Sequence, residues 1–195
     1  MNGQIHTWFP KSVLVVDQLL VDQLPVYETR IKELLEDIGS DSWRTDMLYV
    51  DSTWDRKQKL HEDLIFADLI SAIYENVEIY MEALGYSKEF YSQLKITNMW
   101  ANISKEGDFL YPHVHPNSLL SGAFYIKKAE NSKIKFFNNL TDMFPEPPEF
   151  NQLNFRFCEY TCDPGRLLLF RSDFLHGTGK QSAEEKIVIS FNLSK

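Results

Sequence analysis

From residue 90 onward the hydrophobic pattern has a period of two, and this feature constrains the fold more than any other. The pattern occurs in six short segments: LKITNMWANIS (94–104), SLLSGAFYIK (118–127), KIKFFN (133–138), NFRFCEYTC (154–162), GRLLLF (165–170) and KIVISFNLS (186–194). They are rich in β-branched and aromatic residues, and clusters of Gly, Pro, Asn and Asp separate them, as is typical of strands joined by turns. Because no helical pattern lies between them, we expect an antiparallel double sheet or jelly roll.

Two amphipathic helices are predicted before these strands. In residues 22–38 the apolar side chains recur every three or four positions, Asp22 can cap the start, and Gly39 follows the end. A second apolar stripe runs through 61–84, from Leu64 onward, and Gly85 stops it. The expected fold is therefore mainly β with N-terminal helices packed on an outer face of the jelly roll.

The length and composition favour one domain. A chain of 195 residues with 44% hydrophobic content can build one real core, whereas two domains would be cramped. We expect a single domain over 1–195, with helical support over about 12–90 and a jelly-roll core over about 91–195. The segment 138–154 carries three prolines and is expected to be a long loop, either a lid over a site or a plain surface excursion.

The charge balance disfavours some classes of partner. The net charge is −8, the pI is near 5.1, and no run of five basic residues occurs, so binding to nucleic acid or to an anionic membrane is not expected. No apolar stretch reaches the length of about 18 to 20 residues that spans a bilayer. The first residues, MNGQIHTWFPK, do not resemble a secretory signal. We expect a soluble, cytoplasmic protein, in the host cytoplasm if it is viral.

Cys158 and Cys162 are the only cysteines. In an extended strand they would face the same side about 13 Å apart, at roughly 3.3 Å per residue, which is too far for a disulfide without a bend. We expect buried free thiols, because further ligands for a zinc site are not evident nearby.

Two histidines, His113 and His115, form an HxH pair in the segment LYPHVHP. In an extended segment residues i and i+2 point the same way, so their imidazoles can converge on one ion, although such pairs also occur at surfaces. His176, after the strand GRLLLF, is a third candidate that a jelly roll could bring back beside the pair. The carboxylates of Asp173 and Asp108 could complete the ligand set, but both are more easily interpreted as turn residues.

Lys186 opens the last predicted strand, ten residues after His176. Strand alternation places Lys186 on one face together with Val188, Ser190 and Asn192. A cation directed into a barrel is costly unless an anion meets it, which favours a site for an acidic ligand. Arg166 and Arg171, which flank the LLLF strand, are rival anion anchors or plain solvated strand ends.

These positions resemble the iron(II)- and 2-oxoglutarate-dependent dioxygenases, whose usual signature is HxD, a distal His and a basic residue. The resemblance covers 98–195, with weaker support from TWFPKSVLVV near the start. It is similar to a branch common in marine bacteria and phages, in which Trp and Asn precede HxHP, SGxxY follows and RISISFN ends the fold. Here these features are Trp100, Asn102, HVHPNSLLSGAFY and KIVISFN. Prolyl-hydroxylase-like enzymes are better-known relatives with a comparable strand Tyr, here Tyr125.

Two departures from the usual signature matter. His115 stands where most of the superfamily has Asp, so the implied centre consists of neutral imidazoles and leaves the full charge on the metal, unless a water or Asp173 occupies that position. Lys186 stands in place of Arg and offers a point charge instead of a bidentate fork. The first departure also changes the electron donation to iron relative to an HxD enzyme.

The resemblance implies a role for each candidate residue. His113, His115 and His176 would be the catalytic and metal-ligating residues for iron(II), and Lys186, helped by Tyr125 or Ser190, would anchor the distal carboxylate of 2-oxoglutarate. Molecular oxygen is the second co-substrate, with ascorbate as an accessory reductant, and the products are succinate, CO₂ and usually a hydroxylated substrate. Asn102, Trp100 and Ser121 could line the pocket, although Trp100 is equally well explained as core and Ser121-Gly122 as a site of close strand packing.

Two further functions remain open at this point. A cupin-like metal enzyme without 2-oxoglutarate would use the three histidines and let Lys186 contact the substrate directly. A jelly-roll binding module without turnover would use the histidines structurally or bind zinc adventitiously. The substrate, a small molecule or a peptide, cannot be named from these residues, and a homodimer is compatible with them.

Overall fold

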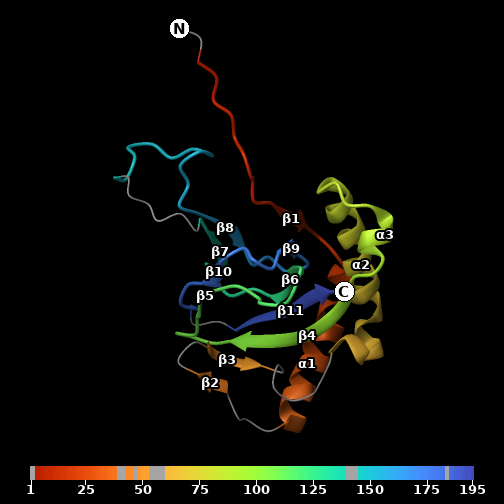
Figure 1. Cartoon of the computed structure of the whole chain (residues 1–195). Coiled ribbons are helices and arrows are strands. Elements are labelled where there is room, and N and C mark those ends of the chain that lie inside the picture. The colour runs from red at the N-terminus through yellow and green to blue at the C-terminus, as the bar shows by residue number, and fades with distance from the viewer. Residues whose placement is uncertain (1–2, 39–42, 46–47, 53–59, 139–144, 183–184) are drawn as a thin grey trace.

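The computed structural model covers the whole chain and describes residues 3–38, 43–45, 48–52, 60–138, 145–182 and 185–195. The described chain forms three layers, namely two antiparallel sheets that face one another and a group of helices on the outer face of one sheet (Figure 1). This arrangement agrees with the predicted jelly roll carrying N-terminal helices.

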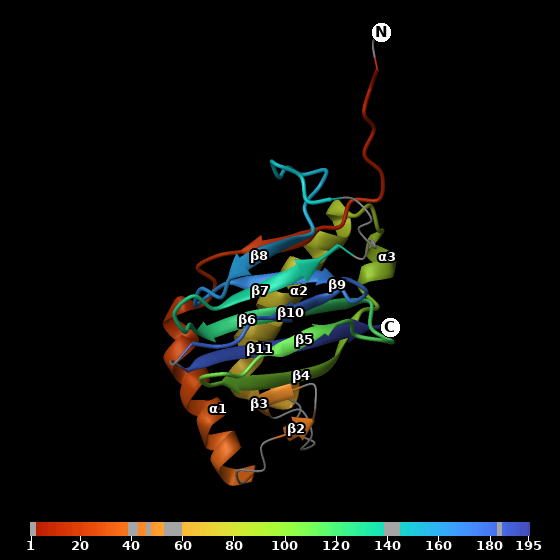
Figure 2. The same ribbon diagram turned by 90° about the vertical axis from the view of Figure 1, so that its left-hand side faces the viewer.

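Antiparallel pairing joins all the strands in the order β1-β9-β6-β11-β4-β3-β5-β10-β7-β8, with β2 beside β3. The strands are β1 (Val13–Val16), β2 (Trp43–Thr45), β3 (Leu48–Ser52), β4 (Lys95–Ser104), β5 (Leu110–His113), β6 (Leu120–Lys127), β7 (Lys133–Phe137), β8 (Phe157–Thr161), β9 (Leu167–Arg171), β10 (His176–Thr178) and β11 (Lys186–Ser194). Strands β1, β9, β6, β11 and β4 make the major sheet, and β5, β10, β7 and β8 make the minor sheet (Figure 2). Strand β3 pairs with both sheets and connects them at one edge.

The helices lie against the major sheet, on the side away from the minor sheet (Figure 1). They are the 3₁₀ helices η1 (Val21–Gln23), η2 (Leu60–Glu62) and η3 (Leu64–Phe66) and the α-helices α1 (Leu24–Ile38), α2 (Ala67–Ala83) and α3 (Lys88–Tyr91). None of the helices in the described part of the chain is long and apolar enough to cross a membrane.

Strand alternation in β11 divides the hydrophobic interior into two cores. Ile187, Ile189 and Phe191 are fully buried in a core shared with α1 and α2. Val188, on the opposite face, belongs to a second core between the two sheets. The alternation predicted for β11 is therefore confirmed, and it places the polar members of that strand between the sheets.

The predicted helices begin differently from the expectation. Asp22 lies inside η1, whose N-cap is Leu20, so Asp22 does not cap α1. Leu64, expected on the buried stripe, is 88% exposed, because it belongs to the separate turn η3, which the side chain of Asp63 caps by accepting from the Ile65 N–H. Gly85, with φ of 82°, follows Leu84, the C-cap of α2, so the helix ends before this glycine as predicted. Gly39 lies outside the described residues.

The N-terminal part also contributes strands, which its helical periodicity did not predict. Strand β1 pairs with β9 along the edge of the major sheet, and β3 pairs with β4.

The two cysteines differ from each other, because Cys158 is exposed and only Cys162 is buried. Both are free, but the expectation of two buried thiols is wrong for Cys158, since β8 is the edge strand of the minor sheet.

Of the predicted loop 138–154, residues 139–144 lie outside the described chain, and 145–154 contain no helix or strand.

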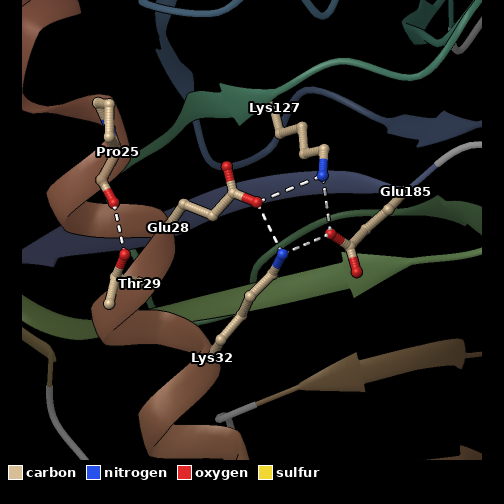
Figure 3. A network of polar contacts seen from close by, with 6 residues as sticks. All are labelled: Pro25, Glu28, Thr29, Lys32, Lys127 and Glu185. Atoms are coloured by element: carbon tan, nitrogen blue, oxygen red, sulfur yellow. Dashed lines mark hydrogen bonds and ion pairs between the residues drawn. The ribbon is translucent and has the colours of Figure 1, made fainter.

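A network of two lysines and two glutamates connects helix α1 to the major sheet (Figure 3). Lys32 lies 2.7 Å from Glu28 and 3.1 Å from Glu185, and Lys127 lies 3.3 Å and 3.1 Å from the same two carboxylates. Glu28 and Lys32 come from α1, Lys127 ends β6, and Glu185 directly precedes Lys186 at the start of β11. The network thus fixes the point at which β11 enters the sheet.

Candidate metal centre and its pocket

A cavity of about 400 Å³ lies between the two sheets. Its lining comes from both sheets, with Trp100 and Asn102 of β4, Tyr125 of β6 and Ser190 of β11 on one side. The opposite side includes His113 of β5, Ile134 of β7 and His176 and Thr178 of β10. The inward-facing positions of the jelly roll therefore enclose a space that is continuous with the inter-sheet core.

Three histidines meet at this cavity. His113 and His176 are directly opposite each other across the pairing of β5 with β10, and His115 follows two residues after His113. The nitrogen atoms that the three rings offer all lie within 4.8 Å of one another, and Nε2 of His115 lies 3.2 Å from Nε2 of His176. The structure thus brings together the HxH pair and the distant histidine that sequence reasoning singled out.

Backbone carbonyls orient two of the three rings. Nδ1 of His113 lies 2.7 Å from the carbonyl oxygen of Tyr111, and Nδ1 of His176 lies 2.8 Å from that of Phe174. A carbonyl oxygen can only accept, so each Nδ1 carries the proton and each Nε2 presents a free lone pair. This is the tautomer in which a histidine ligates a metal through Nε2.

Burial keeps the second and third histidines neutral. Burial and, to a smaller extent, the nearby His113 together lower the pKa of His176 to about 3 and that of His115 to about 4. The hydrogen bond from His176 to Phe174 and the Asn192 side chain beside His115 offset part of this change in pKa. Aromatic rings border the cluster, with Phe170 4.7 Å from His176 and Trp100 6.0 Å from His115 between ring centroids.

The cluster fits a divalent transition metal. Three neutral imidazole nitrogens converge without a protein cation between them, and imidazole suits iron, zinc, copper and nickel. In the described part of the chain no carboxylate joins the cluster. Asp173 forms a surface ion pair with Arg171, and Asp108 accepts from the backbone N–H of Lys105. Neither carboxylate therefore occupies the place that Asp has in the HxD signature.

Lys186 lines the same cavity and is 3% exposed. Burial lowers the pKa of its ammonium group, and the electrostatic influence of Cys162 and Asp108 offsets only part of that effect. Among the described residues no hydrogen bond or ion pair within 4 Å is made by its amine. Apart from the histidines, it is the sole ionisable cation in the lining among the described residues, which include no carboxylate there. A buried ammonium of this kind is costly unless an anion meets it.

Tyr125, Asn102 and Ser190 also line the cavity, as predicted. Tyr125 is 2% exposed, and burial together with the adjacent Cys162 thiol raises its pKa, so its hydroxyl remains a proton donor. In the β11 pairings, Val188 lies opposite Asn102 and Tyr125, which places both near the Lys186 end of the strand. These side chains can donate hydrogen bonds to an acid held by Lys186.

The rival anion anchors are engaged elsewhere. Arg166 pairs with Asp17 at 2.6 Å and with Asp163 at 3.0 Å, and Arg171 pairs with Asp173 at 2.9 Å. Neither arginine lines the cavity.

Gly122 supports the packing explanation for the Ser121-Gly122 pair, because an added Cβ there would lie 2.2 Å from the Phe191 ring.

Sequence reasoning missed two features of the site. Gly177 follows His176, and an added Cβ would lie 2.7 Å from the carbonyl oxygen of Leu110, so the close approach of β5 and β10 requires glycine. Asn192 of β11, placed on the correct face but given no role, lines the cavity beside His115. A glycine directly after a candidate ligand and a polar side chain in the final apolar strand were the available signals.

Comparison with protein families gives one match. Residues 98–192 match the family described as "Putative 2OG-Fe(II) oxygenase". This segment belongs to the 2OG-Fe(II) oxygenase family. The matched oxygenase segment begins in β4 and ends in β11, so it contains all three histidines and Lys186. Among curated proteins, no sequence matches the chain.

Solved structures show that this chain shares its fold with enzymes described as using 2-oxoglutarate. The viral collagen prolyl hydroxylase from Paramecium Bursaria Chlorella virus-1 superposes with a TM-score of 0.63 at 13% identity, covering 93% of this chain and 94% of that one. A prolyl-4-hydroxylase from Pseudomonas putida gives 0.62 at 12% identity, with 95% and 93% covered. SnoN, an α-ketoglutarate-dependent epimerase from nogalamycin biosynthesis, gives 0.69 at 12% identity, with 95% and 79% covered. The predicted double-stranded β-helix is thereby confirmed.

Proposed function

We propose that this protein is an iron(II)- and 2-oxoglutarate-dependent dioxygenase that hydroxylates a small molecule or a peptide. The observation that carries the proposal is the meeting of three imidazoles with one buried lysine in a single cavity, within a segment that matches the oxygenase family. In the overall reaction one atom of O₂ enters the substrate as a hydroxyl group. The other enters succinate, as 2-oxoglutarate loses CO₂.

His113, His115 and His176 would hold the metal through the nitrogens that converge in the cavity. When bound, iron(II) supplies the positions at which 2-oxoglutarate and oxygen bind and the redox chemistry that links them. Because all three protein ligands are neutral, the centre would keep the full charge of the ion and attract the dianionic co-substrate more strongly than a centre with one carboxylate.

Lys186 would receive the distal carboxylate of 2-oxoglutarate. Its ammonium group lacks a protein carboxylate partner among the described residues, so the co-substrate would supply the missing counter-charge. Tyr125 would donate its hydroxyl proton to the same carboxylate, with Asn102 and Ser190 as further donors. These groups would fix the orientation of the co-substrate, because its two ends would be held at opposite places in the cavity.

The apolar lining would limit the access of water. Val188, Phe170 and Ile134 border the cavity and belong to the inter-sheet core or contact it. A low-polarity wall strengthens the interaction between Lys186 and a carboxylate and excludes competing solvent. The substrate would approach from the side where Val114, Pro116 and Ser118 line the cavity, beside His115.

Solved structures of similar proteins support this assignment. The viral prolyl hydroxylase is described as a 2-oxoglutarate complex, and SnoN as a complex with Fe³⁺, α-ketoglutarate and nogalamycin RO. HygX from Streptomyces hygroscopicus is described with nickel, 2-oxoglutarate and hygromycin B. We carry over to this chain the co-substrate and a substrate of small-molecule or peptide type. We also propose that it acts in the cytoplasm as a single domain without a nucleic-acid partner.

Succinate formation tests the proposal. Purified protein with iron(II), ascorbate and 2-oxoglutarate should release succinate slowly even without substrate, and His176→Ala should abolish the release. His6→Ala removes an exposed histidine near the start of the chain and should leave succinate release unchanged. Lys186→Ala should weaken 2-oxoglutarate binding, whereas Lys180→Ala, at an exposed lysine, should not. If wild-type protein neither binds 2-oxoglutarate nor releases succinate, the proposal is wrong.

A further inference from the structure

The three imidazoles of the centre are oriented in two different ways. His113 and His176 each donate Nδ1–H to the backbone carbonyl two residues before them, so their orientation follows from the main chain. His115, at the position that carries Asp in the usual signature, has the side chain of Asn192 beside its ring in the cavity lining. A histidine that ligates a metal through one ring nitrogen has an N–H at the other, and this N–H needs an acceptor. An aspartate ligand has no such N–H. The orientation of His115 therefore depends on a side chain.

Asn192 is itself held by two buried hydroxyl groups. The Ser121 hydroxyl donates to Oδ1 of Asn192 at 2.8 Å, and the Ser172 and Ser121 hydroxyl oxygens are 2.8 Å apart. Ser121 has one hydroxyl proton and gives it to Asn192, so Ser172 donates to Ser121. The exposed fractions are 1% for Ser121, 1% for Ser172 and 3% for Asn192. A buried, directional chain of hydrogen bonds thus fixes the amide with its oxygen in one place.

The backbone reinforces the same connection. The His115 N–H donates to the carbonyl oxygen of Ser172 at 3.0 Å, so Ser172 contacts the main chain of His115 and begins the hydroxyl chain to its ring partner. In the pairing of β11 with β4, the register shifts between Asn192 and Leu193. Bulges of this type redirect a side chain next to a functional site. Asn192 therefore has a local structural reason to point toward His115.

We propose that Asn192 is a positioning residue whose side-chain oxygen accepts the ring N–H of His115, so that Nε2 of this imidazole faces the other two. This inference rests on the proposed metal centre. Ser121 and Ser172 hold the amide oxygen in place, and the three residues together replace the backbone acceptor that His113 and His176 already have. Loss of a hydrogen-bond partner of this kind lowers metal affinity by about 10- to 100-fold.

Cobalt(II) binding to the full-length protein tests the inference without turnover. Titration calorimetry should give a Kd for Asn192→Leu about 10- to 100-fold weaker than for wild type. Asn192→Asp, which keeps an acceptor oxygen at the same place, should bind cobalt(II) at least as well as wild type. In proton NMR spectra of the cobalt(II) protein, the ring N–H signal of His115 should exchange with solvent and disappear in Asn192→Leu. The signals of His113 and His176 should persist.

Asn76→Leu is the matched control, because Asn76 is a buried asparagine of α2 that donates to the Ala72 carbonyl far from the cavity. It should lower thermal stability without changing cobalt(II) affinity. If Asn192→Leu does not fold, Ser121→Ala takes its place and should weaken binding and speed exchange of the His115 N–H. A folded Asn192→Leu or Ser121→Ala protein with wild-type affinity and an unchanged His115 signal overturns the inference alone. Wild-type protein that binds no cobalt(II) overturns the proposed metal centre as well.

Discussion

At the scale of single residues, Lys186 is where stability and function are expected to oppose each other. Its ammonium group is 3% exposed, and the described residues offer it no ion-pair partner. Because burial disfavours the charged form, the folded protein pays for holding this cation in a cavity. The proposed co-substrate would remove that cost by supplying a carboxylate. A residue kept against its own desolvation cost is a strong indication of a ligand.

Replacing Lys186 with Met should therefore stabilise the protein while weakening co-substrate binding. Removing the unpaired buried charge should raise the free energy of unfolding at pH 7 by about 1–3 kcal/mol. The same change should weaken 2-oxoglutarate binding to the nickel(II) protein by roughly 10- to 150-fold, the loss of one charge-assisted hydrogen bond. Chemical denaturation and titration calorimetry measure the two effects.

The stability gain should depend on pH with a definite sign. The folded pKa of Lys186 lies below the ordinary value of 10.5, so between these two pKa values the unfolded chain binds more protons and wild-type stability rises with pH. The advantage of Lys186→Met should shrink as the pH rises through that window. Lys180→Met, at an exposed position, should change neither stability nor binding. A destabilised Lys186→Met protein would contradict the explanation.

At the scale of secondary-structure elements, the close approach of β5 and β10 sets the spacing of His113 and His176. These residues are opposite each other in the pairing of the two strands. A Cβ added to Gly177 would lie 2.7 Å from the carbonyl oxygen of Leu110 and 3.0 Å from the backbone nitrogen of Pro112. The obstructing atoms are backbone, so one strand must move. The geometry of the candidate centre is thus coupled to a single glycine.

Gly177→Ala should separate these two strands. We expect a loss of about 1–3 kcal/mol in the free energy of unfolding, as for other overpacked sites, together with weaker cobalt(II) binding. Gly179→Ala is the control, since an added Cβ there meets nothing within 4 Å. Thermal denaturation and calorimetry on both variants distinguish a local clash from a general effect of alanine. Equal behaviour of the two variants would show that the spacing of β5 and β10 is not critical.

The ion-pair network of Glu28, Lys32, Lys127 and Glu185 should make a small contribution to stability. Glu28→Gln should cost about 0.5–1 kcal/mol at low salt, the usual range for partly exposed pairs, and less at high salt. The control is Glu36→Gln at an exposed position of the same helix. Chemical denaturation at two salt concentrations measures both. An effect that grows with salt would contradict the electrostatic explanation.

The contribution of Glu28 should also vary with pH. Hydrogen bonding to Lys32, opposed by partial burial and aided by Lys127, lowers the folded pKa of Glu28 below its ordinary value of 4.5. The stabilisation is therefore fully present above pH 4.5 and is lost as the pH falls through the folded pKa. Wild type and Glu28→Gln should converge in stability below that point. Denaturation curves at neutral and acidic pH measure this convergence.

The strands of the jelly roll were predictable from sequence because period-two alternation reports which face of the sheet each side chain occupies. Residues 186–194 alternate between the two cores as expected, and the resemblance to the HxH branch singled out the residues that meet in the cavity. The start of α1 and the exposure of Leu64 were not predictable, because a short 3₁₀ turn shows the same apolar spacing as a helix. The role of Gly177 and the partner of His115 depend on contacts between distant strands, so the sequence signals, a glycine directly after His176 and a polar side chain in β11, do not show what these residues contact.

At the scale of the whole molecule, the major sheet separates a structural core from a functional one. Its outer face packs on α1 and α2 through residues such as Tyr27 and Phe124, whose ring centroids are 6.5 Å apart. Its inner face forms the inter-sheet core, where Phe136 contacts Phe170 at 4.9 Å and His176 at 5.8 Å between centroids. Packing defects on the two sides should therefore have different consequences.

Two phenylalanines of equal burial test this division. Phe66, 0% exposed, lies in the helix-side core, and Phe136, 1% exposed, lies between the sheets. Phe66→Leu and Phe136→Leu should each lower the free energy of unfolding by about 1–2 kcal/mol, since each leaves a partial cavity. Only Phe136→Leu should also weaken cobalt(II) binding, because its ring supports His176 directly whereas Phe66 is separated from the cavity by the sheet. Equal loss of metal affinity in both variants would mean that the site depends on overall stability rather than on the wall formed by the minor sheet.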